Sequence, residues 1–327
     1  MVPRYGLWQE RMNNKFSLSI VIPVYNGADT ISALVGKLAL LEIPGGKQIV
    51  LVVDGSPDKS LEICQDLCKT IQNPITLIEL ARNFGEHNAI MAGLAHCWGD
   101  FVITMDDDLQ NPPEEVARLF QFTRDNDYDV VYAQYRTKAH SLWRNLGSQF
   151  TNWCVGITQG KPKSLYLASF RCMSRLVVES ILNYTGPFPY IDGLVLQTTN
   201  NIGALNVEHL PRKHGKSNYS VSRLLHLFSS MFFNFSIMPL RVGAIAGGVL
   251  SLLGFLGFII VVVEALFFST PPGWATVSSA VFLLAGVQLM VLWLIGEYLG
   301  RLYMTANCKP QFIIRSITGN LPGNNNF

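Results

Sequence analysis

The sequence predicts an α/β protein with a mostly parallel sheet, followed by a helix that lies at a membrane surface and two helices that cross the membrane. In the first 220 residues, apolar runs of strand length alternate with segments whose apolar residues recur at helical spacing. Between residues 242 and 300, by contrast, the only charged side chains are Glu264 and Glu297. The same region contains two apolar stretches, each longer than the roughly 20 residues that a bilayer core requires.

Five apolar runs predict strands, because buried parallel strands are continuous apolar segments. In chain order they are residues 18–26, 48–56, 75–81, 100–106 and 128–135. Four segments with helical spacing separate them, at residues 30–41, 58–71, 86–97 and 112–125. Two side chains are expected to cap these helices, Asp58 the second and Asn111 the fourth. Strands separated by helices in this way predict a sheet that is covered on both faces.

Residues 242–268 and 277–300 predict a hairpin of two transmembrane helices, with a pair of buried core helices as the alternative. Basic residues flank the outer ends of this pair: Arg241, Arg301, Lys309 and Arg315. The connector at 269–276 carries no charge, so the positive-inside rule places both termini and the first domain in the cytoplasm. The aromatic-rich segment 220–240 suits an amphipathic helix in the interface, or else a helix packed on the first domain.

The composition indicates an integral membrane protein of a reducing compartment. The 25 Lys and Arg residues nearly balance the 23 Asp and Glu residues, so the totals do not indicate a nucleic-acid partner. The six cysteines include no C-x-x-C pair, and small residues in the predicted membrane helices are compatible with a homo-oligomer. The expected parts are an N-terminal tail (1–16), a soluble domain (17–219), an interfacial helix (220–240), a transmembrane hairpin (241–303) and a cytoplasmic C-terminal tail (304–327).

Polar residues lie at the carboxyl ends of three of the predicted strands. Tyr25 and Asn26 end the first, Asp54 lies near the end of the second, and three adjacent aspartates, residues 106–108, begin at the end of the fourth. Each group alone could be turn chemistry, since turns commonly use Asn, Asp and Gly. Ligands of such sheets bind beyond the carboxyl ends of the strands, however, so the three groups together predict one shared binding site.

Three adjacent carboxylates repel one another unless a positive charge lies among them. If the fourth strand persists through Asp106, then Asp106 and Asp108 point to one side of it and Asp107 to the other. Two carboxylates followed by the carbonyl of Gln110 offer the hard oxygen ligands that Mg²⁺ or Mn²⁺ prefers. A capping cluster for the next helix is the alternative, but it explains Asn111 and not the three acids before it.

Six motifs, in this order, resemble those of the polyprenyl-phosphate glycosyltransferases of glycosyltransferase family 2: VIPVYN, DGS, RNFGEHNAIMAG, DDDLQNPPEE, GKSNYS and GEYLGRLY. That group includes dolichyl-phosphate mannose synthases, bactoprenyl glucosyltransferases and undecaprenyl-phosphate formamido-arabinose transferases. The resemblance runs from about residue 17 to residue 315, and it is closest to the last of these through NPPEE and GEYLGR.

The resemblance implies a GT-A fold, which is Rossmann-like, and an inverting transfer of a sugar from a nucleotide-sugar, with UDP favoured, to a membrane polyprenyl phosphate. The product would serve cell-envelope glycan or lipopolysaccharide modification at a bacterial inner membrane. Asp106 and Asp108 would be the catalytic D-x-D pair and would hold Mg²⁺ or Mn²⁺ with Gln110. The implied donor-binding residues are Pro23, Tyr25, Asn26, Asp54, Arg82, Gly85 and Asp106.

An acceptor phosphate would need cationic side chains near the membrane face. The second pKa of a phosphate monoester is near ~6, so the acceptor is already a nucleophile at neutral pH and needs no strong general base. The residues expected to contact it are Arg136, Arg144, Ser169, Arg171, Arg212 and Lys216. The resemblance favours Ser169 and Arg171 in particular, whereas contacts with lipid headgroups are the alternative for some of the basic residues.

Three positions depart from the pattern of the family. Its members usually carry Glu where this chain has Gly27, often carry an acid where it has Val53, and commonly carry Asp where it has Leu165. The third departure leaves open a catalytically impaired, membrane-anchored scaffold that binds nucleotide-sugars, and a GDP-mannose-using enzyme is a further alternative. A processive polysaccharide synthase would typically have a Q-x-x-R-W motif, which this sequence lacks.

Overall fold

The computed structural model describes residues 16–135, 165–208, 273–307 and 309–319, together with residues 210, 245, 247, 249, 252, 256 and 259. The chain divides into two compact units. The first contains Met1–Ser220 and Pro310–Phe327, and the second contains Val221–Lys309. The chain therefore leaves the first unit, forms the second, and returns to the first.

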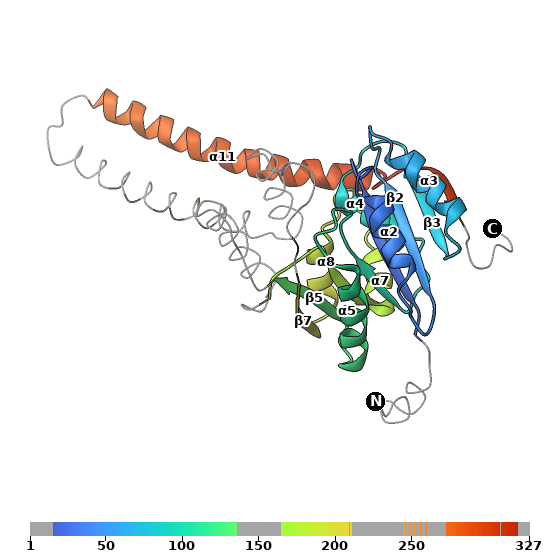
Figure 1. The fold of residues 1–327 in the computed structure, drawn as a ribbon. Helices are drawn as coiled ribbons and strands as arrows, with labels where there is room; N and C mark the ends of the chain where they lie inside the picture. The colour runs from blue at the N-terminus through green and yellow to red at the C-terminus, as the bar shows by residue number, and fades with distance from the viewer. Residues whose placement is uncertain are drawn as a thin grey trace. The chain divides into compact units, whose positions relative to one another are not determined.

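A mixed sheet forms the centre of the first unit, and its described strands follow the order β7-β5-β6-β4-β1-β2-β3-β8 (Figure 1). The strands are β1 (Leu18–Val24), β2 (Lys47–Val53), β3 (Ile75–Leu80), β4 (Phe101–Thr104), β5 (Val130–Tyr135), β6 (Arg171–Ser174), β7 (Ile202–Val207) and β8 (Ile314–Gly319). Parallel pairing joins β1 to β2 and β4, β2 to β3, and β5 to β7. By contrast, β6 and β8 pair antiparallel with their neighbours.

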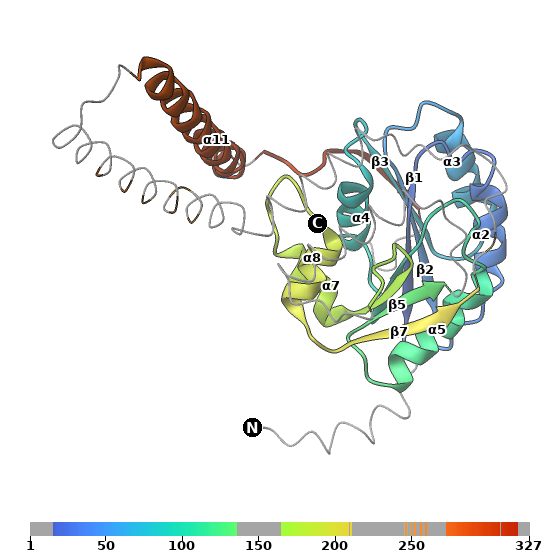
Figure 2. The ribbon, with the colours of Figure 1, turned by 90° about the vertical axis from the view of Figure 1, so that its left-hand side faces the viewer.

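Helices cover both faces of this sheet. They are α2 (Ile31–Ala39), α3 (Ser60–Thr70), α4 (Glu86–Leu94), α5 (Pro113–Asp125), α7 (Arg175–Leu182) and α8 (Ile191–Thr198). Figure 2 shows α2, α3 and α5 on one side of the sheet and α4, α7 and α8 on the other. The result is a three-layer arrangement in which the carboxyl ends of β1, β2 and β4 lie at one edge, because these strands are parallel neighbours.

The core lies around the two central strands. Every residue of β2 is buried, and in β1 only Pro23 is partly exposed. Gly93 of α4 allows that helix to approach closely, since an added Cβ would lie 2.3 Å from a methyl group of Val21. Pro23 is tolerated in a central strand because β4 pairs with β1 only as far as Val21, opposite Thr104.

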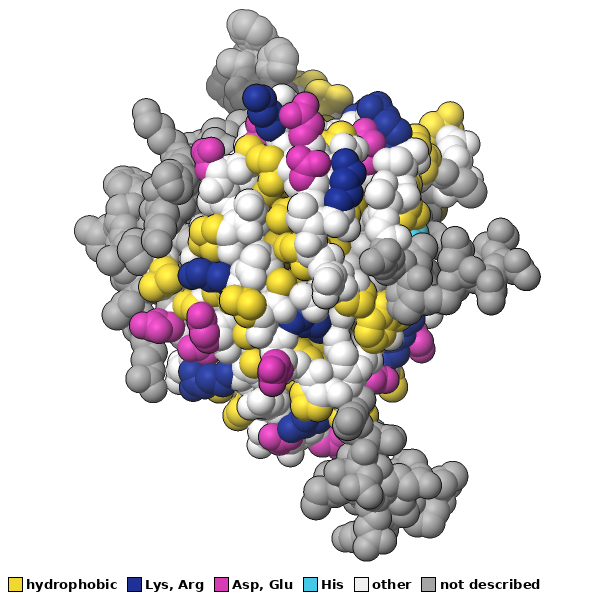
Figure 3. Space-filling model, turned by 45° about the vertical axis from the view of Figure 1, so that its right-hand side comes forward, with side chains coloured by type: hydrophobic (Ala, Val, Ile, Leu, Met, Phe, Trp, Pro, Cys, Tyr) yellow, Lys and Arg dark blue, Asp and Glu magenta, His cyan; other side chains and the backbone are white. Residues whose placement is uncertain are grey.

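The described surface carries both signs of charge. On the face drawn in Figure 3, Lys and Arg side chains are interspersed with Asp and Glu and with apolar side chains. This mixture follows from the near balance of 25 basic and 23 acidic residues in the chain.

The five predicted strands and four predicted helices are confirmed, with ends that differ by a few residues. Neither helix has its expected side-chain N-cap: α3 begins after Lys59 and α5 after Pro112, both without a side-chain cap, and Asn111 instead accepts a hydrogen bond of 3.0 Å from the hydroxyl of Tyr135. Asp58 does lie at the start of α3, where its carboxylate accepts hydrogen bonds from the backbone and the hydroxyl of Ser60. Strands β6, β7 and β8 were not anticipated from the sequence, and β8 lies where a C-terminal tail was expected.

The second unit contains α11 (Trp274–Ala306), which includes the predicted span at 277–300. In the part of the chain that the structure describes, no helix meets the length and hydropathy of a membrane span. The expected interfacial helix at 220–240 and most of the span at 242–268 lie outside the described residues. The membrane hairpin therefore stays a prediction.

Candidate active site

The turn after β1 is tied to the loop that follows β2. Asn26 has a left-handed backbone, with φ of 56°, and its N–H donates to the hydroxyl of Ser56 at 2.8 Å. The N–H of Gly27 donates to the hydroxyl of Ser60 at 3.0 Å. Tyr25 is 43% exposed and therefore accessible to a ligand. These bonds join the turn after β1 to the loop after β2 and to the first residue of α3.

Asp54 fixes the conformation of the loop at residues 81–85. Its side chain is buried, and its two carboxylate oxygens accept the N–H groups of Phe84 at 2.7 Å and of Gly85 at 2.8 Å. Burial raises the pKa of Asp54, and these two backbone hydrogen bonds oppose that rise. Gly85 has φ of 94°, which favours glycine at the start of α4. Asp54 thus acts on the predicted donor site through this loop.

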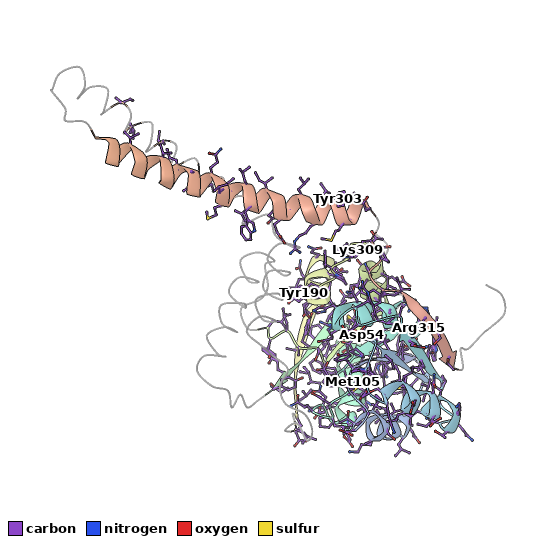
Figure 4. All side chains as sticks on the ribbon, turned by 90° about the horizontal axis from the view of Figure 1, so that it is seen from above. Asp54, Met105, Tyr190, Tyr303, Lys309 and Arg315 are labelled. Atoms are coloured by element: carbon purple, nitrogen blue, oxygen red, sulfur yellow. The ribbon has the colours of Figure 1, made fainter. Side chains whose placement is uncertain are left out.

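Arg82, another predicted donor residue, belongs to this loop, and Gly55, to which the sequence analysis gave no role, packs beside it. The guanidinium of Arg82 stacks 4.7 Å from the ring of Phe84, and the Arg82 side chain is exposed. Gly55 packs directly on the loop, since a Cβ added there would lie 2.4 Å from backbone atoms of Arg82 and Asn83. Figure 4 shows Asp54 together with Met105, which immediately precedes the three aspartates.

The acidic segment does not continue the strand. Because β4 ends at Thr104, the alternation expected for residues 106–108 does not apply, and that argument for their directions is wrong. Leu109 has φ of 60°, a left-handed backbone that bulky residues rarely adopt. Its side chain packs against the core, which holds the strained turn in place.

The carboxylate of Asp106 is hydrogen-bonded to the segment that precedes β6. This carboxylate accepts a hydrogen bond of 2.7 Å from the hydroxyl of Ser169, whose own carbonyl accepts one of 2.6 Å from Thr104. Desolvation, followed by the nearby charge of Glu86, raises the pKa of Asp106 to about 7. Sequence reasoning assigned Ser169 to the acceptor and did not anticipate that it would hold Asp106. Glu86, exposed in the first turn of α4, was also missed.

Asp107 faces a different set of groups. Its carboxylate is stabilised by the backbone N–H of Tyr25, and a Cβ added to Gly27 would lie 2.2 Å from its Oδ2. Desolvation, with the charges of Asp106 and Asp108, raises its pKa to about 7. Gly27 therefore gives the Asp107 carboxylate its space, which accounts physically for the absence of a side chain at that position.

Asp108 and Gln110 flank the strained residue Leu109. Oδ1 of Asp108 accepts the N–H of Gln110 at 3.1 Å, and the main-chain carbonyl of Gln110 accepts the N–H of Leu210 at 2.9 Å. One lone pair of that carbonyl is thereby engaged, and the side-chain amide of Gln110 offers a second oxygen. Crowded carboxylates with raised pKa values fit a bound cation, which would stabilise their ionised forms. No three His, Cys, Asp or Glu side chains of the described residues form a metal-binding group by themselves.

Arg171 lies inside the protein. Its side chain is 1% exposed, and it forms an ion pair with Asp192, which also accepts a hydrogen bond of 3.0 Å from the hydroxyl of Tyr132. Arg171 therefore does not face solvent, from which an acceptor phosphate would approach.

His87 packs edge-to-face on Tyr190, with ring centres 5.3 Å apart, and desolvation lowers its pKa to about 4.

The remaining acceptor candidates lie outside the described residues: Arg136, Arg144, Arg212 and Lys216. Leu165, the third position at which the sequence departs from the resembled family pattern, is buried. The structure thus brings the predicted donor and metal residues to one edge of the sheet, whereas the acceptor side is described only at Ser169 and Arg171.

The comparison with known proteins identifies the family. The family model described as Glycosyl transferase family 2 matches residues 19–175. An undecaprenyl-phosphate 4-deoxy-4-formamido-L-arabinose transferase of Edwardsiella ictaluri is 34% identical over 307 residues, which make up 92% of this chain and 94% of that protein. The chain belongs to glycosyl transferase family 2. The transferase of the same name from Pseudomonas aeruginosa is 35% identical, over 93% of this chain and 91% of that protein.

Solved structures confirm the GT-A fold of this family 2 member. A glucosyl-3-phosphoglycerate synthase from Mycobacterium tuberculosis, in complex with phosphoglyceric acid, aligns with a TM-score of 0.52 at 16% identity, covering 70% of this chain and 81% of that chain. The same enzyme in complex with Mn²⁺, UDP-glucose and phosphoglyceric acid gives a TM-score of 0.51 at 16% identity, covering 68% and 79%.

Proposed function

We propose that this family 2 member transfers a sugar, with inversion, from a UDP-sugar to a membrane polyprenyl phosphate. The similarity to undecaprenyl-phosphate 4-deoxy-4-formamido-L-arabinose transferases, over more than nine-tenths of both chains, carries the proposal. The acidic turn after β4 supports it, because the acids crowd together at the edge of the sheet where ligands of such folds bind.

The donor would lie along the ends of β1, β2 and β4. Tyr25, Asn26 and the loop that Asp54 fixes would contact the nucleoside, and Arg82 the diphosphate. Asp106, Asp108 and the amide of Gln110 would hold Mg²⁺ or Mn²⁺, which would neutralise charge on the departing nucleotide diphosphate. A solved structure that shares the fold contains Mn²⁺ and UDP-glucose, which supports a divalent ion and a UDP donor.

In the reaction, an oxygen of the acceptor phosphate forms a bond to C1 of the sugar. The bond from C1 to the diphosphate oxygen breaks, and its electron pair leaves with the nucleotide diphosphate. Because the acceptor is a dianion near neutral pH, the main task of the protein is alignment of the two substrates. We assign Arg136, Arg144, Arg212 and Lys216 to the acceptor phosphate, and we give Ser169 and Arg171 a supporting role behind Asp106.

We further propose that the chain is an integral protein of a bacterial inner membrane, with the first unit in the cytoplasm. The two apolar stretches at 242–268 and 277–300 and the basic residues at their outer ends support this topology. On α11, large apolar side chains such as Leu289, Trp293 and Leu302 are more than half exposed, as expected of a helix that lipid or another chain covers.

The test is incorporation of label from radiolabelled nucleotide-sugars into polyprenyl phosphate by membranes that contain the protein, with Mg²⁺ or Mn²⁺. We expect a chloroform-soluble product with at least one UDP-sugar and a loss of about 10²–10³ in rate for Asp108→Asn, by comparison with a lost electrostatic group in other enzymes. Asp66→Asn is the matched control, because Asp66 lies on α3 in an exposed ion pair.

The donor panel also separates the alternatives. If labelled lipid formed only with GDP-mannose, the donor would be GDP-mannose and the proposed UDP-sugar would be wrong. Metal-dependent UDP binding without product from any donor would favour a catalytically impaired scaffold, for which the buried Leu165 in place of an acid is the supporting observation.

A further inference from the structure

The last described strand of the chain contacts the loop at the predicted donor site. β8 pairs antiparallel with β3 along the edge of the sheet, and it is reached only after the second unit (Figure 1). Residues 81–85, which Asp54 and Gly55 fix from one side, follow β3 directly. The start of this donor loop therefore lies between the end of β2 and the beginning of β8.

Two hydrogen bonds join the donor loop to the C-terminal segment, and both involve the backbone of Ala81. Its N–H donates to the carbonyl of Ile313 at 2.8 Å, and its carbonyl accepts a hydrogen bond of 3.0 Å from Nη2 of Arg315. The next residue is Arg82, which is assigned to the donor diphosphate. Both polar backbone groups of Ala81 are thus satisfied by residues from the end of the chain.

Arg315 is itself held in place by β3. Its Nη1 lies 3.2 Å from Oε1 of Glu79, whose other oxygen accepts a hydrogen bond of 2.9 Å from the hydroxyl of Ser316. The Glu79 side chain is largely buried, at 14% exposed, whereas Arg315 is 62% exposed. An ion pair this exposed adds little stability, so the distinctive contact of Arg315 is the one to the carbonyl of Ala81. Figure 4 labels both Asp54 and Arg315.

We propose that β8, through Arg315 and together with the preceding residue Ile313, positions the donor loop, so that affinity for the nucleotide depends on a strand that follows the second unit. Arg315 is a positioning residue in this proposal, since it acts on the donor through Ala81 and Arg82. The inference rests on the proposed function only in identifying what the loop binds.

The first test is hydrogen exchange of the peptide that covers residues 81–85, in the full-length protein without ligand. Arg315→Met should make the N–H groups of this peptide exchange severalfold faster. The carbonyl of Ala81 loses its hydrogen bond to Arg315, so the loop backbone opens more often. Ser316→Ala is the matched control: it removes another side-chain bond from β8 to Glu79 but none from the loop, so it should exchange like the wild type. Equal exchange in all three proteins would overturn the proposal.

The second test is binding of UDP in the presence of Mn²⁺. Loss of one hydrogen bond should weaken UDP binding by about two- to tenfold in Arg315→Met, with acceptor KM and kcat unchanged. Arg315→Lys should lie in between, since one ammonium cannot bind both partners as a guanidinium does. If wild-type protein binds UDP and Arg315→Met binds it equally well, the positioning role is wrong. If wild-type protein does not bind UDP, the proposed donor is wrong, while the exchange result still tests the loop.

Discussion

The three aspartates after β4 have three different surroundings. Asp106 accepts a hydrogen bond from Ser169, Asp107 accepts the N–H of Tyr25, and Asp108 accepts the N–H of Gln110. The crowding of these acids was predictable, because the three aspartates are adjacent in the sequence and follow an apolar strand. The partner of Asp106 was not, since Ser169 lies 63 residues away along the chain and reaches it through the pairing of β4 with β6.

Ser169→Ala tests whether this hydroxyl holds Asp106 for a metal. Removal of a side chain that orients a metal ligand typically lowers metal affinity by about 10- to 100-fold. We therefore expect weaker Mn²⁺ binding, measured by calorimetry in the presence of UDP, and recovery in Ser169→Thr, which keeps the hydroxyl. Ser180→Ala, on the exposed face of α7, should bind Mn²⁺ like the wild type; equal binding by Ser169→Ala would contradict the assignment.

Asp107 is expected to contribute less to metal binding than Asp108. Its carboxylate faces Tyr25 and Gly27, so Asp107→Asn should keep the Mn²⁺ affinity within about threefold, whereas Asp108→Asn should lose a charged ligand and more than about tenfold. The same calorimetric titration measures both. Equal losses in the two variants would place Asp107 among the ligands.

At the scale of elements, continuous apolar runs identified the strands that are buried on both faces, and the missed strands lack that pattern. β6 has only four residues and begins with Arg171, a buried charge that no apolar pattern marks as core. β8 is a polar edge strand whose side chains are partly or fully exposed. Helix α8 is fixed to the sheet by the Arg171–Asp192 ion pair and by the hydroxyl of Tyr132, and such partners are not visible in local sequence.

Asp192→Ala should be strongly destabilising, because it leaves the buried guanidinium of Arg171 without its counter-charge. Removal of one partner of a buried ion pair costs about 3–5 kcal/mol. The free energy of unfolding, from denaturant titration followed by circular dichroism, measures this effect. Arg171→Met with Asp192→Leu should recover much of it, since an apolar pair leaves no buried charge. A loss below about 1 kcal/mol in Asp192→Ala would show that the pair is not buried in solution.

For the whole molecule, the change in composition near residue 220 indicates where the first unit gives way to the second, and the structure divides the chain at Ser220. The return of the chain to the first unit could not be predicted, because residues 304–327 have the composition of a tail. The pairing of β8 with β3 is a long-range contact that depends on the shape of the sheet edge and not on any local pattern.

Truncation after Lys309 removes β8 and tests whether this strand protects the edge of the sheet at β3. Without β8, the backbone N–H and C=O groups of β3 form an exposed edge, which promotes association of chains. We expect an increased aggregated fraction in size-exclusion chromatography of detergent-solubilised protein. Deletion of residues 320–327 alone keeps β8 and should remain monodisperse; similar profiles for both truncations would show that β8 does not protect the edge.

The position of β8 in the chain also sets an order for biosynthesis. A ribosome makes β1 to β7 first, then the whole second unit, and only afterwards the strand that completes the sheet. A nascent chain can therefore form most of the first unit while Ala81 still lacks both of its C-terminal partners. Full affinity for the nucleotide should therefore arise late, after α11 has been synthesised, so that an immature chain competes poorly for the donor.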